Sequence, residues 1–470
     1  MEWEQLLSTK RQREFVTSHH YKNTDLRSAF EKDYHRIIGS ASFRRLQDKT
    51  QVFPLDKSDF IRTRLTHSLE VSSFAKSLGQ TIGQNIIECK NDKYFDLQMK
   101  EDICNILQCA GLIHDIGNPP FGHFGETSIR EWFEKNLPKL QFHGQSIDDC
   151  LLPQMKEDFY HFEGNAQALR LVSKLHYLVD EKGMNLTYAL LNTIIKYPVS
   201  SLGIDKSTGN IKDKKMGYYY ADQEIFNEIQ TITGTNGNRH PLTYILEAAD
   251  DIAYKTADIE DAFVKGFITY EQLREELKTL EPAGEAENQM PLEVLDKIYE
   301  KGRINKVTNP EHYAVQNWIV RMQGAMINCA THGFTSNYTK IMNGTFRTDL
   351  FCGTFGEPLM NLLGDMAYRR VFTTDLIYKL EVAESEIINV LMDRFMKAAI
   401  RYDTDETMDS IDIRMMSFVS ENYKNAYHYH GHGKSEEEKL YLRLLLITDY
   451  ICGMTDSYAK RLYQELNGII

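Results

Sequence analysis

A histidine–aspartate pair, His114 and Asp115, stands at the end of an apolar helical segment of the sequence. A carboxylate buried there without a partner would be unfavourable, so the pair needs a cation, a hydrogen-bond donor or water. A neutral imidazole and a carboxylate are common ligands of Mn, Fe, Ni or Mg-like ions, and the dyad could give one nitrogen and one oxygen to such an ion. Taken alone, the pair is more typical of a hydrogen-bonded helix end than of a metal site.

Two further residues favour a metal site. His67 lies at the start of a predicted helix, and Asp250 lies in an apolar helical pattern where two adjacent aspartates are unusual. The gaps in this H…HD…D order are long, so only the fold can bring the four residues together. An octahedral ion with four protein ligands would keep open positions for water or phosphate oxygens.

His123 and Glu126 are three positions apart, so a helical turn would place them on one side. A carboxylate beside an imidazole can fix its tautomer and raise its basicity. The alternative is a loop histidine with an acidic neighbour, which is common on any surface. The position in a Gly/Pro-rich loop shortly after Asp115 favours a functional pair.

Phosphate and sugar contacts are also suggested by spacing. Arg64 precedes His67 by three positions and would project beside it, which favours phosphate contact over an ordinary surface arginine. Asp250, Tyr254 and Asp258 form one stripe of a predicted helix, along which a tyrosine could stack under a sugar and an aspartate could bind a hydroxyl. The alternative is an amphipathic stripe at a helix interface.

The elements that must position these residues are mainly helices, because apolar residues recur at helical spacing and long alternating runs of Val, Ile and Thr are missing. Helices are predicted over residues 64–84, 101–116, 242–264, 311–330, 374–399 and 437–466. Short strands are predicted at Gln51–Phe53, Tyr218–Tyr220 and Asn337–Met342, and loops at 199–215 and 280–291. We expect one large helical body, with a core over residues 1–270 and a helical C-terminal extension over residues 271–470.

Composition excludes several classes of protein. The chain has 470 residues, 42% hydrophobic and 26% charged, which are globular values. A net charge of −13 argues against a nucleic-acid-binding coat over the whole surface, although it allows a local basic pocket. No run of 18 apolar residues and no secretory signal are found, and seven dispersed cysteines without a CxxC motif are typical of reduced thiols. We therefore expect a cytoplasmic protein without a membrane span.

The sequence segments around these residues resemble those of a known family. SFRRLQDKTQVFPL, RTRLTHSLEV, HDIGNPPFGHFGE, HFEGNAQALR and RHPLTYILEAADDIAYKTADIEDA together are similar to the deoxyguanosinetriphosphate triphosphohydrolases (dGTPases), which are HD-domain metal phosphohydrolases. The resemblance covers roughly residues 34–265, with a weaker similarity at LITDYICGMTDSYA near the end. No motif anchors it between about 270 and 435.

The resemblance implies an HD-domain helical bundle and a set of site residues. It makes His67, His114, Asp115 and Asp250 metal ligands, and His123 the catalytic acid/base supported by Glu126. It implies substrate contacts by the following residues: Gln51 on the deoxyribose, Lys196, Tyr197 and Lys215 along the triphosphate, and Arg64, Tyr254 and Asp258 in the roles given above. Asn118, His161 and Asn165 are further pocket candidates. Lys215 lies beside the predicted loop and could close over a bound nucleotide.

The activity implied is metal-dependent hydrolysis of dGTP to deoxyguanosine and inorganic triphosphate, by water attack at the α-phosphorus. Mg or Mn suits the hard phosphate oxygens and the mixed ligands, with Fe, Co or Ni as further candidates. The alternatives are a triphosphohydrolase of broad dNTP specificity, another HD phosphohydrolase, or a regulator of the same fold that responds to nucleotides or single-stranded DNA. The resemblance also implies a homo-oligomer, a hexamer or a tetramer, with a nucleotide or single-stranded DNA as a candidate effector.

Overall fold

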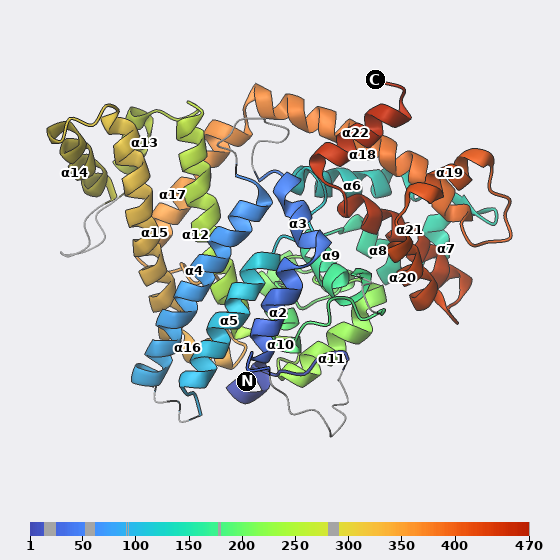
Figure 1. Ribbon diagram of the computed structural model, residues 1–470, viewed down its shortest axis with the longest axis horizontal. Helices are drawn as coiled ribbons and strands as arrows, with labels where there is room; N and C mark the ends of the chain where they lie inside the picture. Colours follow the sequence, from blue (N-terminus) through green and yellow to red (C-terminus); the bar gives the residue numbers. More distant parts are fainter. Residues whose placement is uncertain are drawn as a thin grey trace.

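The computed structural model describes residues 1–13, 25–51, 62–90, 92, 94–176, 180–280 and 291–469. Within these ranges the chain is mainly helical, as predicted (Figure 1). The regular strands of this part are β1 (Gln141–Phe142) and β2 (Gln145–Ser146), which form one antiparallel hairpin. The site candidates are therefore held by helices and by the turns between them.

Four long helices form the left-hand part of the molecule in Figure 1. They are α4 (Arg64–Asn85), α5 (Leu97–Ile113), α12 (Pro241–Val264) and α15 (Pro310–Ser336). Helix α4 packs against the other three. Its buried residues Val71, Ala75, Leu78 and Ile82 recur at helical spacing, and Thr63 caps its first turn through a reciprocal bond with Thr66.

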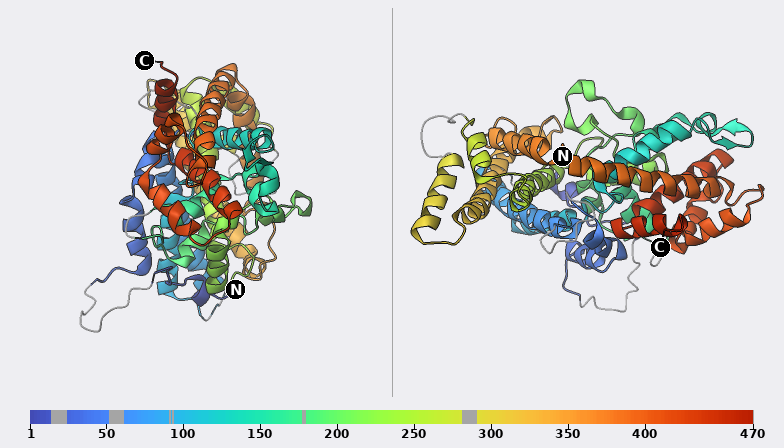
Figure 2. Two further views of the ribbon diagram at one scale, coloured as in Figure 1. Left: turned by 90° about the vertical axis from the view of Figure 1, so that its right-hand side faces the viewer. Right: turned by 90° about the horizontal axis from the view of Figure 1, so that it is seen from above.

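The other half of the molecule is organised by α18 (Asp375–Arg401), which runs along the top in Figure 1. Helix α18 packs against α6 (Gly122–Asn136), α21 (Glu436–Cys452) and α22 (Asp456–Leu466). The two views of Figure 2 show the C-terminal helices beside α18. Helix α18 thus brings these helices near α6, from which they are far away in the sequence. Helices after residue 271 thus contact those before it, and the division at residue 270 stays a prediction.

Shorter elements connect these helices. The remaining α-helices are α1 (Trp3–Leu6), α2 (Ala29–Ile38), α3 (Ala41–Arg45), α7 (Ile147–Cys150), α8 (Pro153–Tyr160), α9 (Gly164–Arg170), α10 (Tyr188–Thr193), α11 (Gln223–Thr233), α13 (Tyr270–Leu277), α14 (Pro291–Ile304), α16 (Tyr338–Met342), α17 (Glu357–Ala367), α19 (Ser410–Phe418) and α20 (Glu421–Gly431). Five 3₁₀ turns are described: η1 (Leu46–Asp48), η4 (Ser201–Gly203), η5 (Lys206–Thr208), η6 (Ile211–Asp213) and η7 (Tyr220–Asp222). Three π-helical turns, η2 (Ile86–Lys90), η3 (Leu171–Leu175) and η8 (Tyr368–Phe372), each follow an α-helix directly.

Two predicted strands are wrong. Asn337–Met342 continues from α15 into α16, with the Asn337 amide bonded to the Gly333 carbonyl. Tyr218–Tyr220 is a bend that leads into a 3₁₀ turn, where the Tyr220 amide donates to the Asp158 side chain instead of a neighbouring strand. Of the third predicted strand, Gln51 lies in a bend and residues 52–53 lie outside the described residues.

The predicted helix over residues 437–466 is two helices. Helix α21 ends at Cys452, and α22 begins after Thr455, whose side chain accepts a hydrogen bond from the Tyr458 amide and caps the new helix. The turn between them, Gly453–Thr455, therefore replaces what the periodicity predicted as one helix.

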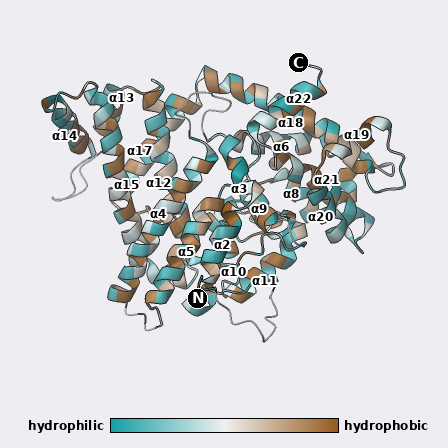
Figure 3. Cartoon of the chain, viewed as in Figure 1, coloured by the Kyte–Doolittle hydropathy of each residue, from teal (hydrophilic) through white to brown (hydrophobic). Residues whose placement is uncertain are grey.

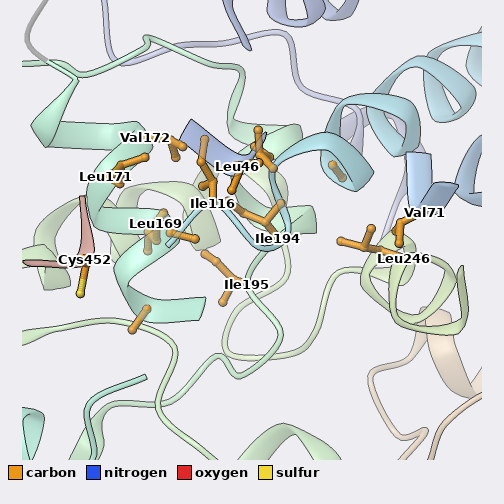
Figure 4. Close-up of a cluster of buried hydrophobic side chains, with 14 of the residues drawn as sticks. Leu46, Val71, Ile116, Leu169, Leu171, Val172, Ile194, Ile195, Leu246 and Cys452 are labelled. Atoms are coloured by element: carbon orange, nitrogen blue, oxygen red, sulfur yellow. The ribbon is translucent and has the colours of Figure 1, made fainter. Parts of the chain in front are cut away.

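The apolar core extends beneath the site candidates. In the cluster of Figure 4, Ile116, which directly follows His114 and Asp115, lies among Leu46, Leu169, Ile194 and other buried side chains from distant parts of the chain. Figure 3 shows apolar and polar residues alternating around the long helices, as expected for helices with one buried face. No described helix is both long and apolar enough to cross a membrane.

Candidate functional site

The four proposed metal ligands come from three helices that pack together. Helix α4 begins at Arg64, so its first turn carries His67. Helix α5 ends at Ile113, so His114 and Asp115 follow at its C-terminal end. Helix α12 packs against both α4 and α5 and carries Asp250 near its middle. The long sequence gaps between these residues are therefore closed by helix packing.

The four side chains meet at short distances. The Asp250 Oδ1 atom lies 3.2 Å from His67 Nε2 and 3.4 Å from His114 Nε2. Asp115 Oδ1 lies 3.6 Å from His114 Nε2. One ligand atom each from His67, His114 and Asp115 can be chosen so that all three lie within 4.8 Å of one another. This is a mixed nitrogen and oxygen set that a single divalent ion could bridge.

The hydrogen bonds of His114 fit a cation in this set. His114 Nδ1 lies 2.8 Å from the Gly111 carbonyl, which can only accept, so Nδ1 carries the proton and Nε2 presents a lone pair toward the acids. His114 Nε2 is buried and makes no hydrogen bond within the described part of the chain, and the same holds for His67 Nδ1. A lone pair facing carboxylates is unfavourable unless a proton or a metal ion lies between them.

Cations and an amide surround the two carboxylates. Arg64 donates to Asp115 Oδ2 at 2.5 Å, Asn118 donates to Asp115 Oδ1 at 2.9 Å, and Lys196 donates to Asp250 Oδ2 at 3.0 Å. Burial alone would raise the pKa of Asp115, but His114 and Arg64 outweigh it and lower that pKa. Burial is likewise outweighed at Asp250, where Lys196 and His114 hold the pKa well below its usual value. Both acids are thus ionised and available to a cation.

His123 and Glu126 form the pair that their spacing predicts. Both lie in the first turns of α6, and His123 Nδ1 lies 3.2 Å from Glu126 Oε2. The His123 side chain is 75% exposed, whereas that of Glu126 is 2% exposed. The hydrogen bond and charge of Glu126 raise the pKa of His123. The pair therefore presents an imidazole that keeps its proton to higher pH than a free histidine.

Glu126 is held in place by the start of α9. Its Oε1 atom accepts a hydrogen bond from the Gly164 amide at 2.8 Å. A side chain at Gly164 would not fit, because a Cβ atom there would lie 2.2 Å from Asn118 Oδ1 and 2.6 Å from Glu126 Oε1. The glycine of the FEGN segment thus allows the close approach that orients the His123–Glu126 pair.

A cavity of about 640 Å³ opens over this site. Its charged wall, as we call Arg64, Asp115, His123, Lys196 and Asp250, carries the groups described above. Four more predicted residues line it: Gln51, Asn118, Asn165 and Tyr254. A second part of the lining, the α18 wall, consists of Tyr368, Phe372, Ile377, Leu380, Glu381 and Glu384 from η8 and α18. The cavity is large enough for a small ligand and joins a charged surface to a largely apolar one.

Four of the predicted substrate-binding residues do not line this cavity. His161 is paired with Glu157 at 3.3 Å and is about half exposed. Tyr197 is buried. The Lys215 ammonium lies 2.8 Å from Glu163, a buried acid that also accepts from Asn165 at 2.6 Å. Both Asp258 carboxylate oxygens are buried and lack a hydrogen bond within the described residues. The parts that these residues play stay predictions.

The cavity also contains a residue that sequence reasoning missed. Glu384 is 1% exposed, and its Oε1 atom has no hydrogen-bond partner in the described structure. Burial, with the nearby charges of Asp456 and Glu381, raises the pKa of Glu384 to about 8. No motif marks this part of the sequence. Two further missed residues bond to the backbone of residues that line the cavity: Lys49 to Asn118, and Asp456 to Thr50 and Phe121.

Comparisons with known proteins agree with these features. The HD domain family model matches residues 64–184. The chain is 51% identical to a deoxyguanosinetriphosphate triphosphohydrolase-like protein of Listeria innocua, over the full length of both chains. It is 33% identical to a deoxyguanosinetriphosphate triphosphohydrolase-like protein of Synechocystis, with both chains covered in full. It is also 33% identical to the deoxyguanosinetriphosphate triphosphohydrolase of Yersinia enterocolitica, over 94% of each chain.

Proposed function

Because the chain belongs to the deoxyguanosinetriphosphate triphosphohydrolase-like family of HD-domain proteins, we propose that it hydrolyses dGTP to deoxyguanosine and inorganic triphosphate. The observation that carries the proposal is the His–His–Asp set, with both histidines buried and no hydrogen bond at His114 Nε2 within the described chain. Its Asp115 lines a cavity that is also lined by two cations, Arg64 and Lys196. A nucleoside triphosphate has the matching charge at one end and the matching apolar surface at the other.

A divalent ion, Mg or Mn, with Fe, Co or Ni as further candidates, would be held by His67, His114, Asp115 and Asp250. When bound, it supplies Lewis-acid stabilisation of phosphate charge. Arg64 and Lys196 would bind the phosphate chain, since both ammonium and guanidinium groups already lie beside the carboxylates of the set. Tyr197 and Lys215 would extend this contact if Lys215 leaves Glu163 for the more highly charged triphosphate.

His123 would be the general acid. Attack of water forms a bond between its oxygen and the α-phosphorus, releases a water proton to solvent and breaks the bond from the α-phosphorus to the 5′ oxygen. This alkoxide leaves poorly unless it is protonated. His123 lines the cavity, and Glu126 favours its protonated form by raising its pKa. Transfer of the His123 proton to the 5′ oxygen releases the deoxynucleoside, and the three phosphates leave as one triphosphate.

The nucleoside would lie between Tyr254 and the α18 wall. Gln51 and Tyr254 would contact the deoxyribose, with Asn118, Asn165, Asp258 and His161 as further candidates. In its ionised form Glu384 would support dGTP as a substrate, because guanine offers two adjacent N–H donors that a carboxylate can accept. The largely apolar remainder of the wall would hold any base, which favours broad dNTP specificity as the second candidate function.

The test is product analysis. Metal-loaded protein is incubated with each of the four dNTPs, and products are separated by anion exchange. Deoxynucleoside and triphosphate are expected, with dGTP the preferred substrate under the main proposal and similar rates under the second. Deoxynucleoside monophosphate and pyrophosphate, or no turnover, would refute both. The same assay with added dNTP or single-stranded DNA, and a mass measurement in solution, test the proposed effectors and the proposed homo-oligomer.

A further inference from the structure

The turn between α21 and α22 is bonded to two segments of the cavity wall. Asp456, the first residue of α22, accepts from the Thr50 amide and the Thr50 hydroxyl, both at 2.8 Å, through Oδ2. Its Oδ1 atom accepts from the Phe121 amide at 2.9 Å. Lys49 Nζ donates to the Asn118 carbonyl at 2.5 Å and to the Cys452 carbonyl at 2.6 Å. Residues 49–50 and 118–121 are thus joined through the C-terminal turn.

The backbone at Phe121 needs such support. Phe121 has a φ of 64°, in the left-handed region that a bulky residue rarely adopts, and it begins α6 without a side-chain cap. Gly122 follows with a φ of 60°. A residue in this region persists when its surroundings hold it there. The bond from the buried Asp456 carboxylate to the Phe121 amide is such a restraint.

We infer that Asp456 is a positioning residue for the reaction: from the first turn of α22 it holds the backbone of Thr50 and Phe121, and so places Gln51 and His123 on the cavity wall. Gln51 directly follows Thr50, and His123 lies two residues after Phe121. Displacement of a reacting group by about 1 Å can lower a rate by about 100-fold. The inference rests on the proposed function for its catalytic consequence, although the restraint itself can be measured without any substrate.

Asp456→Asn is the informative variant. Asparagine keeps the size of the side chain but replaces one acceptor oxygen by an NH₂ donor, so either the Phe121 or the Thr50 amide faces another donor. The matched control is Asp33→Asn. Asp33 is also buried, and its Oδ2 accepts from the Thr187 amide at 3.0 Å and the Thr187 hydroxyl at 2.7 Å, while Oδ1 accepts from Arg11. Asp33 therefore also joins two segments by hydrogen bonds from both carboxylate oxygens, but it does not line the cavity.

The first measurement is amide hydrogen exchange. In Asp456→Asn we expect exchange to rise by about tenfold or more in peptides over residues 45–51 and 118–126, and to stay near wild type in those peptides of Asp33→Asn. Equal exchange in the two variants would overturn the inference, and this result does not depend on which substrate the protein accepts.

The second measurement compares two leaving groups. Loss of a positioned acid and of a sugar contact should lower kcat/KM for dGTP. It should hardly change kcat/KM for p-nitrophenyl triphosphate, because p-nitrophenolate leaves without protonation and this substrate has no sugar. In Asp456→Asn we expect kcat/KM to fall about 10- to 100-fold on dGTP and less than about threefold on p-nitrophenyl triphosphate, as for His123→Ala. Asp33→Asn should leave the ratio of the two rates unchanged.

If Asp456 only stabilises the fold, the variant should lose activity equally on both substrates, because less of the protein is folded. That result, or wild-type rates on both substrates, would overturn the inference. A second check is the double variant His123→Ala/Asp456→Asn. On dGTP it should lose less activity relative to His123→Ala than Asp456→Asn loses relative to wild type, because the acid cannot be lost twice and only the Gln51 contact remains to be lost. If wild type yields no triphosphate from any dNTP, the proposed function fails while hydrogen exchange still decides the inference.

Discussion

The charged wall and the α18 wall line one cavity and differ in how their polar groups are satisfied. On the charged wall, Asp115 and Asp250 each have a cation within hydrogen-bonding distance. On the α18 wall, the buried Glu384 carboxyl has one oxygen without a partner in the described structure, among Phe372, Ile377 and Leu380. The first wall is preorganised for fixed charge, and the second offers apolar area and one adaptable carboxyl.

This difference has a functional meaning. Charge stabilisation in a reaction depends on groups that are held before the substrate arrives, because reorienting them would lower their effect. Arg64, His67 and His114 are accordingly buried, with exposures of 3%, 1% and 4%. Recognition of a base requires less rigidity, and Tyr368 on the α18 wall is 64% exposed. We expect changes on the charged wall to affect the rate most and changes on the α18 wall to affect substrate choice.

Removal of a proposed ligand tests the charged wall most severely. In His114→Ala we expect turnover to fall by at least about 1000-fold and the bound metal to be lost, because two carboxylates then lack the imidazole between them. Metal content by mass spectrometry and triphosphate release measure the two effects. His332→Ala, an exposed histidine on α15, is the control and should keep both. Full turnover by His114→Ala would remove the metal-site assignment.

A smaller change tests how closely the charged wall is packed. Gly122 has a φ of 60°, and a Cβ atom there would lie 2.3 Å from an Arg64 guanidinium nitrogen. We expect Gly122→Ala to displace Arg64 from Asp115 and lower kcat by about 100-fold while metal binding is retained. Gly266→Ala is the matched control, since Gly266 also has a positive φ, of 77°, but no atom within 4 Å of an added Cβ. It should show only the backbone strain, about 1 kcal/mol of stability.

The His123–Glu126 pair gives a pH-dependent prediction. A general acid must be protonated, so kcat falls as pH rises through its pKa, and the raised pKa of His123 keeps the acid active to higher pH. In Glu126→Gln the amide oxygen can still accept from Gly164, which leaves the NH₂ group toward His123. The imidazolium then loses its acceptor and its pKa falls toward about 6.5.

The pH profile of kcat measures this effect. We expect the alkaline limb of Glu126→Gln to lie at lower pH than in wild type, with a rate loss of about 10-fold above that limb and a smaller loss at acid pH. A uniform loss at every pH, with the limb unmoved, would contradict the part given to Glu126. His123→Ala should abolish the limb.

The contrast between the walls also explains what the sequence could predict. Most of the charged wall lies in segments that resemble the family, and this resemblance, rather than the spacing, implied His67, His114, Asp115 and Asp250 as one set. The four side chains do lie close together, and their role as metal ligands stays a prediction. The α18 wall lies in a region with no motif, and nothing about Glu384 in the sequence says that its helix crosses the cavity. Asp456 was visible only as part of a weak similarity, because its contacts with Thr50 and Phe121 depend on tertiary packing. Local periodicity also missed the turn that separates α21 from α22.

The smallest expected effect concerns the α18 wall and the choice of base. With a pKa of about 8, the Glu384 carboxyl is protonated below that pH and ionised above it. The protonated form donates one hydrogen bond and accepts another, which matches the N1 acceptor and the amino donor of adenine. The ionised form only accepts, which matches the two N–H donors of guanine. The ratio of kcat/KM for dGTP to that for dATP should therefore rise by about tenfold as pH increases through 8.

Taking this ratio isolates the base from the chemistry, because titration of His123 or of the phosphate site changes both rates alike. The amide of Glu384→Gln has one donor and one acceptor group at every pH. The ratio of kcat/KM for dGTP to that for dATP should therefore not change with pH in this variant and should favour dATP. Glu381→Gln, on the same wall, removes a neighbouring acid that helps to raise the Glu384 pKa, and should move the midpoint of the rise to lower pH without abolishing it. A flat wild-type ratio would mean that Glu384 does not contact the base. The α18 wall would then hold the base by apolar contact alone, which supports the broad dNTP specificity proposed as the second candidate.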